Sequence, residues 1–179
     1  MSNNTSIICC DRNKNNEIVA NSCGVCYATA YQESFASECQ GDQFFESFSA
    51  LYKTLSYQIS EDIKEKLNIK GLVCELGGCS AKEGTEKGLF RKTVPLLFYL
   101  AANNGFKYIF SFVANSRTRK IFETMNMSSI AQVDLWQFEH NGEKPFAAVD
   151  KENRFPCFMW KQIAWVLIII CLFLIWFFS

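Results

Sequence analysis

The residues most suggestive of chemistry lie in a loop between a predicted strand and a predicted helix. The loop reads AKEGTEKGLFRKT over residues 81–93 and follows the apolar run GLVCELGGCS. Glycines at such a junction are typical of phosphate-binding loops, because backbone N–H groups and the positive end of the helix dipole then face the anion. Glu83, Glu86 and Phe90 oppose an anion here, whereas Lys87 and neighbouring basic residues favour one. These residues therefore leave phosphate binding open.

Cysteine is the second residue type that suggests chemistry. The chain has nine cysteines and one histidine, and Cys23 and Cys26 have the CxxC spacing of a redox pair or half a zinc site. No second CxxC follows, and the surrounding run EIVANSCGVCYATAY predicts a strand, on which residues three apart point to opposite faces. We therefore predict thiols that pack as small apolar side chains, with no metal site. The absence of a signal peptide favours a reducing compartment.

Composition limits the class of protein. With 179 residues, of which 49% are hydrophobic and 15% aromatic, the chain is long enough for one domain with a substantial core. Its 18 basic residues balance its 18 acidic ones. Nucleic-acid-binding domains usually carry a basic excess, so we predict no nucleic-acid partner.

The last segment of the sequence is almost wholly apolar. From Ile163 to Phe178 no residue is charged or strongly polar. As a helix these 16 residues would span roughly 25 Å at about 1.5 Å per residue, near the lower limit for a bilayer core. We therefore predict a transmembrane tail anchor at 162–179 and a folded domain at 1–161.

Basic residues lie on one side of this predicted anchor. Lys151, Arg154 and Lys161 precede it, and no charged side chain follows it. Cytoplasmic flanks of membrane helices carry an excess of Lys and Arg. We therefore expect a single-pass membrane protein whose domain faces the cytosol.

Hydrophobic spacing sets the elements that must position the loop. Apolar residues at intervals of four, three and four, from Phe44 to Leu55, mark one face of a helix, and Ser60 suits the N-cap of a second one. Asn115 or Ser116 would cap a later helix that ends at Asn126. Strands are predicted over 5–10, 17–31, 72–76, 107–114, 130–138 and 157–160. The order β, β, α, α, β, α, β, α, β, β predicts an α/β (α+β) domain on a mixed sheet.

Three stretches carry a resemblance to a known family: LAANNGFKYIF, FVANSRTRKIFETMNM and IAQVDLWQFEHNGEKPF. In this order they resemble the GCN5-related N-acetyltransferase (GNAT) superfamily, and most nearly its arylalkylamine, dopamine-type members. The resemblance covers roughly residues 5–161. It implies transfer of an acetyl group from acetyl-CoA to an amine, with the cofactor arm held where two parallel strands, here 72–80 and 107–114, splay apart. The implied cofactor contacts are Gly78, Cys79, Ser80, Lys87, Gly88 and Asn115.

The loop departs from the family pattern. Aligned on LAANNGF, Gly88 matches a family glycine, whereas Thr85 replaces an Arg or Gln and Phe90 replaces a Gly or Ala. Proline inside a helix costs about 3 kcal/mol, so Pro95 leads us to expect the helix to begin near Thr93, a turn later than in the family.

The catalytic groups also depart from the pattern. Phe122 stands where many relatives place a Tyr as general acid. Glu75 is the best remaining candidate for a base, and its alternative is a strand residue that faces a polar contact. The resemblance also leaves no room before residue 5 for the family's opening strand and first two helices. We therefore expect an N-terminally truncated GNAT-like domain.

Three functions remain open. The first is a pseudoenzyme: a membrane-anchored GNAT-fold protein, degenerate in acetyl-CoA binding, that acts as an accessory or structural subunit of a membrane complex. The second is an active tail-anchored N-acetyltransferase that uses acetyl-CoA on an amine. The third is a lipid-modifying or lipid-sensing domain. The family's opening strand and first two helices could also be supplied by another chain.

Overall fold

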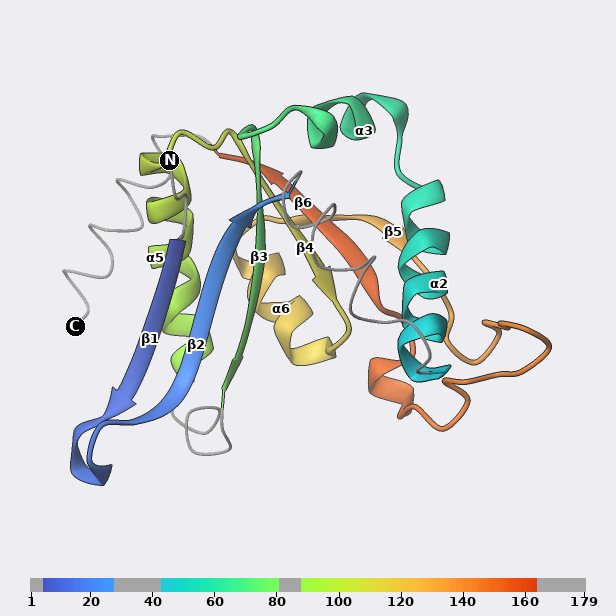
Figure 1. Ribbon diagram of the computed structural model, residues 1–179, viewed down its shortest axis with the longest axis horizontal. Coiled ribbons are helices and arrows are strands. Elements are labelled where there is room, and N and C mark those ends of the chain that lie inside the picture. Colours follow the sequence, from blue (N-terminus) through green and yellow to red (C-terminus); the bar gives the residue numbers. More distant parts are fainter. Residues whose placement is uncertain (1–4, 28–42, 81–87, 164–179) are drawn as a thin grey trace.

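The computed structural model describes residues 5–27, 43–80 and 88–163. In this part of the chain, six strands form one sheet that is flanked by four α-helices (Figure 1). The predicted order of elements is confirmed. The elements are β1 (Thr5–Asp11), β2 (Glu17–Cys26), α2 (Gln43–Tyr57), α3 (Glu61–Asn68), β3 (Val73–Ser80), α5 (Leu89–Asn103), β4 (Tyr108–Val113), α6 (Ser116–Thr124), β5 (Ser128–Gln132) and β6 (Cys157–Gln162), with short 3₁₀ turns at Arg12–Lys14 and Lys151–Asn153.

The sheet is mixed, as the sequence predicts. Its strand order is β1-β2-β3-β4-β6-β5. β3 and β4 are parallel, and the other neighbouring strands are antiparallel. β6 therefore lies inside the sheet between β4 and β5, while β5 forms one edge and β1 the other (Figure 1).

The parallel strands separate soon after they meet. Their pairing runs from Val73 opposite Tyr108 to Glu75 opposite Phe110. β3 continues to Ser80 and keeps its pairing with β2 throughout. The predicted splay between these two strands is confirmed.

Two hydrophobic cores cover the two faces of the sheet. Successive strand residues point to opposite faces, so Phe110 and Phe158 pack under α2 and α3, whereas Ile109 and Met159 pack under α5 and α6. All four of these strand side chains have no accessible surface. The two cores fix which side chains can reach the gap between β3 and β4 from each face.

Local capping signals explain the limits of α6. The Asn115 side chain accepts a hydrogen bond from the backbone N–H of Arg117 at 2.8 Å, as predicted for an N-cap. Asn126 has φ of 57°, the left-handed conformation that ends helices, as predicted. Ser60 precedes α3 in extended conformation, but its side chain makes no capping hydrogen bond.

The start of α5 differs from the prediction. The helix begins at Leu89 rather than near Thr93, and Pro95 lies inside it. Gly88, with φ of 64°, ends the loop, and its carbonyl accepts the Lys92 N–H at 3.2 Å to close the first turn. Pro95 is the seventh residue of α5 and removes one backbone hydrogen bond without ending the helix, so the expected one-turn delay is wrong.

The strand predicted over 130–138 is shorter than expected. β5 ends at Gln132 because the next residues form a turn, in which the Asp134 carboxylate accepts the Trp136 N–H at 3.1 Å. Asp134 also pairs with Arg154 through Nε at 2.6 Å. This ion pair holds the turn against the chain that leads into β6.

No helix within 5–27, 43–80 or 88–163 is long and apolar enough to cross a membrane. Most of the predicted anchor, residues 164–179, lies outside these ranges, and so does Lys87. The side chains of Cys79 and Ser80 are also outside the description, although their backbone belongs to β3.

Candidate functional site where β3 and β4 diverge

The point of divergence is held by a buried side chain. The Ser111 hydroxyl of β4 donates a hydrogen bond to the Leu76 carbonyl of β3 at 2.8 Å. These two residues come directly after the last paired position of β3 and β4. The side-chain hydrogen bond therefore links the two strands where their backbone pairing has ended. Ser111 is 2% exposed, which makes this bond a fixed feature of the gap.

Glu75 lies one position before the divergence, on the face covered by α2. It is opposite Phe110 in the parallel pairing, and Tyr52 of α2 donates a hydrogen bond to its carboxylate. Burial raises the pKa of Glu75 to about 7, and the bond from Tyr52 offsets part of that rise. Near neutral pH, Glu75 is therefore divided between its charged and neutral forms.

Several aromatic rings pack in the core on the same face of the sheet as this carboxylate. The Tyr27 ring packs edge-on against Phe110, with centroids 5.0 Å apart. The Tyr52 ring contacts Phe158 at 4.7 Å and Phe112 at 6.0 Å. Sequence reasoning missed Tyr52, although its spacing of four residues from Phe48 places it on the same apolar helix face.

The opposite face of the gap is covered by Phe90 and Phe122. A Cβ atom added to Gly78 would lie 3.0 Å from the Phe90 ring and 2.6 Å from the carbonyl of Asn21. The Phe90 ring also meets the Phe122 ring edge-on, with centroids 6.0 Å apart. Phe90 thus packs directly on the backbone of Gly78, and only glycine fits at that position.

Two buried hydroxyl groups fix the turn that presents Phe90. Thr93 Oγ1 donates to the Phe90 carbonyl at 3.0 Å and lies 2.8 Å from the Ser22 hydroxyl of β2. Ser22 and Thr93 are 1% and 4% exposed. The first turn of α5 is therefore tied to the sheet, and the position of Phe90 is tied with it.

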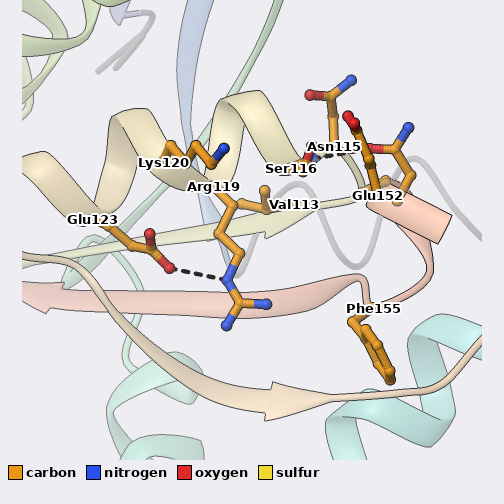
Figure 2. Close-up of a pocket in the computed structure, with 10 residues that line it drawn as sticks. Val113, Asn115, Ser116, Arg119, Lys120, Glu123, Glu152 and Phe155 are labelled. Carbon is orange, nitrogen blue, oxygen red and sulfur yellow. Dashed lines mark hydrogen bonds and ion pairs between the residues drawn. The ribbon is translucent and has the colours of Figure 1, made fainter.

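Asn115 lies at a second hollow, at the N-terminus of α6 (Figure 2). Its side-chain oxygen caps the helix, and Asn153 accepts the Ser116 N–H at 3.0 Å. The cavity of about 230 Å³ is lined by both signs of charge, because Glu152 and Glu123 accompany Arg119 and Lys120. Arg119 turns toward Glu123, with Nε and Oε1 3.0 Å apart, so its charge is partly compensated (Figure 2).

Comparisons with known proteins give a result at the level of structure. The sequence matches no family profile and no curated protein. Among solved structures, arylalkylamine N-acetyltransferase 2 from Aedes aegypti is similar with a TM-score of 0.70 at 19% identity, over 89% of this chain and 74% of that one. A Drosophila melanogaster polyamine N-acetyltransferase gives a TM-score of 0.65 at 8% identity, over 88% and 74%. The C-terminal condensation domain of Ebony, in complex with beta-alanyl-dopamine, gives 0.62 at 13% identity, over 89% and 72%.

The chain has the GNAT fold. This confirms the sequence resemblance at the level of the fold, and the similar solved structures include arylalkylamine N-acetyltransferases. At identities of 8–19%, these likenesses speak for architecture and not for activity.

The GNAT fold implies an acetyl-CoA site, and the family resemblance puts the cofactor arm along Gly78 and its neighbours. The Phe90 ring packs against Gly78 on the side of β3 that α5 covers. Gly88 precedes the first turn of α5, and the N–H groups of that turn are one feature typical of a phosphate site.

The structure brings only some of the predicted site residues together. Glu75 and Gly78 belong to opposite faces of β3, on the two sides of the gap. The Asn115 oxygen is used as a helix cap, in agreement with the alternative weighed from sequence. Cofactor contacts from Gly78, Cys79, Ser80, Lys87, Gly88 and Asn115 stay predictions, as does the role of Glu75 as a base.

Proposed function

We propose that this protein is a GNAT-fold pseudoenzyme that acts as an accessory subunit of a membrane complex. One observation carries the proposal: the Phe90 ring packs on Gly78 and against Phe122, beside the strand along which the family resemblance leads us to expect a cofactor arm. The buried bonds of Thr93 hold that ring in position.

The cost of displacing Phe90 gives the size of the effect. Exposing a fully buried Phe side chain costs about 1.5–3 kcal/mol, and Phe90 is half-buried, so displacing it costs less than the upper value. A ligand that needs this space would lose at most about 3 kcal/mol, which corresponds to at most a roughly 150-fold weaker affinity. The charges of Glu83 and Glu86 in the loop sequence add to the penalty for a pyrophosphate.

The membrane part of the proposal rests on the sequence. Residues 162–179 form a tail anchor, and the preceding Lys151, Arg154 and Lys161 favour a cytosolic orientation of the domain. Deletion of 162–179 should move the protein from the membrane fraction to the soluble fraction. Retention of the shortened chain in alkali-washed membranes would contradict the anchor.

Calorimetric titration of the detergent-solubilised full chain with acetyl-CoA tests the loss of the cofactor site. We expect no binding by the wild type at millimolar ligand and measurable binding by Phe90→Ala. Phe98→Ala is the control, because Phe98 is a buried ring of α5 that lies near Lys161 of β6 and is not among the atoms nearest to Gly78. Low-micromolar binding by the wild type would overturn the proposal.

The accessory role has a separate test. Mild detergent extraction of membranes should recover the protein at a fixed stoichiometry with other subunits, before and after a salt wash. A protein that migrates alone under the mildest extraction would contradict the accessory role, whatever the titration shows.

Glu75 favours a second candidate, an active N-acetyltransferase. A carboxylate with a pKa of about 7 in an aromatic setting suits a general base that removes a proton from an amine. A GNAT phosphinothricin acetyltransferase from Sinorhizobium meliloti, solved in complex with acetyl-CoA, shares the fold at 9% identity and a TM-score of 0.50. Turnover of acetyl-CoA by the wild type that Glu75→Gln lowers at least tenfold would favour this candidate.

A further inference from the structure

The two cysteines of the CxxC stretch, Cys23 and Cys26, lie on opposite faces of β2, and Cys26 lies beside a third cysteine, Cys74. Cys26, the last residue of β2, lies directly opposite Cys74 of β3 in the antiparallel pairing. Both side chains pack into the core under α5 and α6. Cys23 lies on the other face, where its sulfur is 3.9 Å from the position of a Cβ on Gly77. The sheet therefore brings Cys26 to Cys74 and separates it from Cys23.

The backbone already meets the requirement for a disulfide. Directly opposed residues of antiparallel strands have Cα atoms about 4.5–5.5 Å apart. Disulfides bridge Cα separations of about 4.4–6.8 Å. No strand has to move for Cys26 and Cys74 to be linked.

The Cys74 sulfur lies over β2 on the same face as Cys26. Cys74 Sγ occupies the space that a side chain on Gly24 would fill, since a Cβ there would lie 2.6 Å from it. Gly24 is two residues before Cys26 on the same face of β2. A rotation about χ1 of Cys74 moves its sulfur along the strand toward Cys26, whose Sγ accepts the Gly71 N–H at 3.2 Å.

We infer that Cys26 and Cys74 form a reversible cross-strand disulfide when the protein meets a thiol oxidant such as glutathione disulfide. The partly exposed thiolate of Cys26 attacks the oxidant, forms a mixed disulfide and releases one glutathione thiolate. Cys74 then loses its proton, attacks Cys26 Sγ and expels the second glutathione, which takes up the proton. Two thiols are oxidised and one glutathione disulfide is reduced.

The two cysteines have unequal roles in this sequence. Cys74 has no accessible surface, and burial raises the pKa of its thiol to about 12. It is therefore a poor first nucleophile and reacts only once Cys26 carries the leaving group. The mixed disulfide at Cys26 should accumulate before the internal bond closes.

The bond would lie beside the candidate site. Cys74 directly precedes Glu75, and Tyr27, which packs on Phe110, directly follows Cys26. Oxidation would fasten the end of β2 to β3 at the three-residue stretch where β3 pairs with β4. The redox state of the pair would then set how firmly the Glu75 side of the gap is held.

The test is a redox titration of the full chain in detergent with glutathione and glutathione disulfide, followed by alkylation and peptide mass spectrometry. We expect a Cys26–Cys74 linked peptide and a more than tenfold fall in alkylation of Cys74 after unfolding. Cys26→Ser should abolish the link and leave Cys74 open to alkylation after unfolding. Cys23→Ser and Cys79→Ser are the matched controls, because each removes a neighbouring cysteine and should leave the link intact.

Three outcomes would overturn the inference. One is glutathione retained on Cys26 with Cys74 still reduced at the most oxidising ratio. Another is Cys74 that stays protected from alkylation in Cys26→Ser because it is linked to a different cysteine. The third is a link that disappears in Cys23→Ser or Cys79→Ser while the protein keeps its wild-type melting temperature. Because Cys26 is partly exposed, its variant tests the link without disturbing the buried core at Cys74.

Discussion

Replacing Glu75 by Gln should remove a penalty that grows as the pH rises. The pKa of Glu75 is about 7 in the folded protein, against an ordinary value of 4.5. The folded state therefore prefers the neutral carboxyl, and stability falls as the pH rises from about 4.5 through 7. At about 1.4 kcal/mol per unit of pKa, the full cost well above pH 7 is at most about 3.5 kcal/mol. Gln cannot ionise, but its oxygen can still accept the hydrogen bond from Tyr52.

The assay is urea unfolding of the full chain in detergent, followed by Trp fluorescence at pH 5, 6, 7 and 8. The difference in unfolding free energy between Glu75→Gln and the wild type should increase with pH and approach about 3 kcal/mol at pH 8. Glu17→Gln, at an exposed position of β2, is the control and should run parallel to the wild type. Parallel curves for Glu75→Gln and the wild type would refute the assignment of a buried, titrating carboxyl at Glu75.

Further predictions concern contacts that hold the site. Gly24→Ala should lower the free energy of unfolding by about 1–3 kcal/mol, because the new Cβ would lie 2.6 Å from Cys74 Sγ. Adding Cys74→Ala to that variant should restore most of the lost stability, measured by thermal unfolding. Asn115→Ala should cost about 1 kcal/mol of unfolding free energy by removing the cap of α6, whereas Asn115→Asp should cost little. Arg154→Lys should lower the melting temperature, because Lys keeps the charge but not the two-pronged bond to Asp134. Arg154 holds the pKa of Asp134 below its ordinary value of 3.8, so the ion pair stabilises the fold above about pH 4 and stops doing so as Asp134 takes up a proton at lower pH. The difference in melting temperature between Arg154→Lys and the wild type should therefore shrink below about pH 4.

Features governed by local signals could be predicted from the sequence. Asn115 and Asn126 act within one turn of their own helix, so their capping roles follow from residue type and position. The alternation and helical spacing of apolar residues fix the order of the elements in the same way. The splay of β3 and β4 came from the family resemblance, and the pairing confirms it.

Features governed by distant partners could not be predicted. The start of α5 depends on the buried contact between Thr93 and Ser22, which are 71 residues apart in the chain. The early end of β5 depends on Asp134 meeting Arg154. The contact of Phe90 with Gly78 likewise joins two elements that no periodicity connects. Nor does any pattern in the sequence indicate that Tyr52 bonds to Glu75.

The interior position of β6 has a consequence for the order in which the domain can form during synthesis. β5 pairs with β6 alone in the described sheet, and β4 has only a three-residue pairing with β3 until β6 arrives. A nascent chain from which residues 157–162 have not yet emerged therefore carries an unfinished sheet, in which β4 and β5 each lack the partner β6. The half of the sheet that holds the aromatic rings on the same face as Glu75 can assemble only after this last strand leaves the ribosome. A ribosome-bound chain should thus expose the unpaired edges of β4 and β5 to chaperones until translation has passed β6.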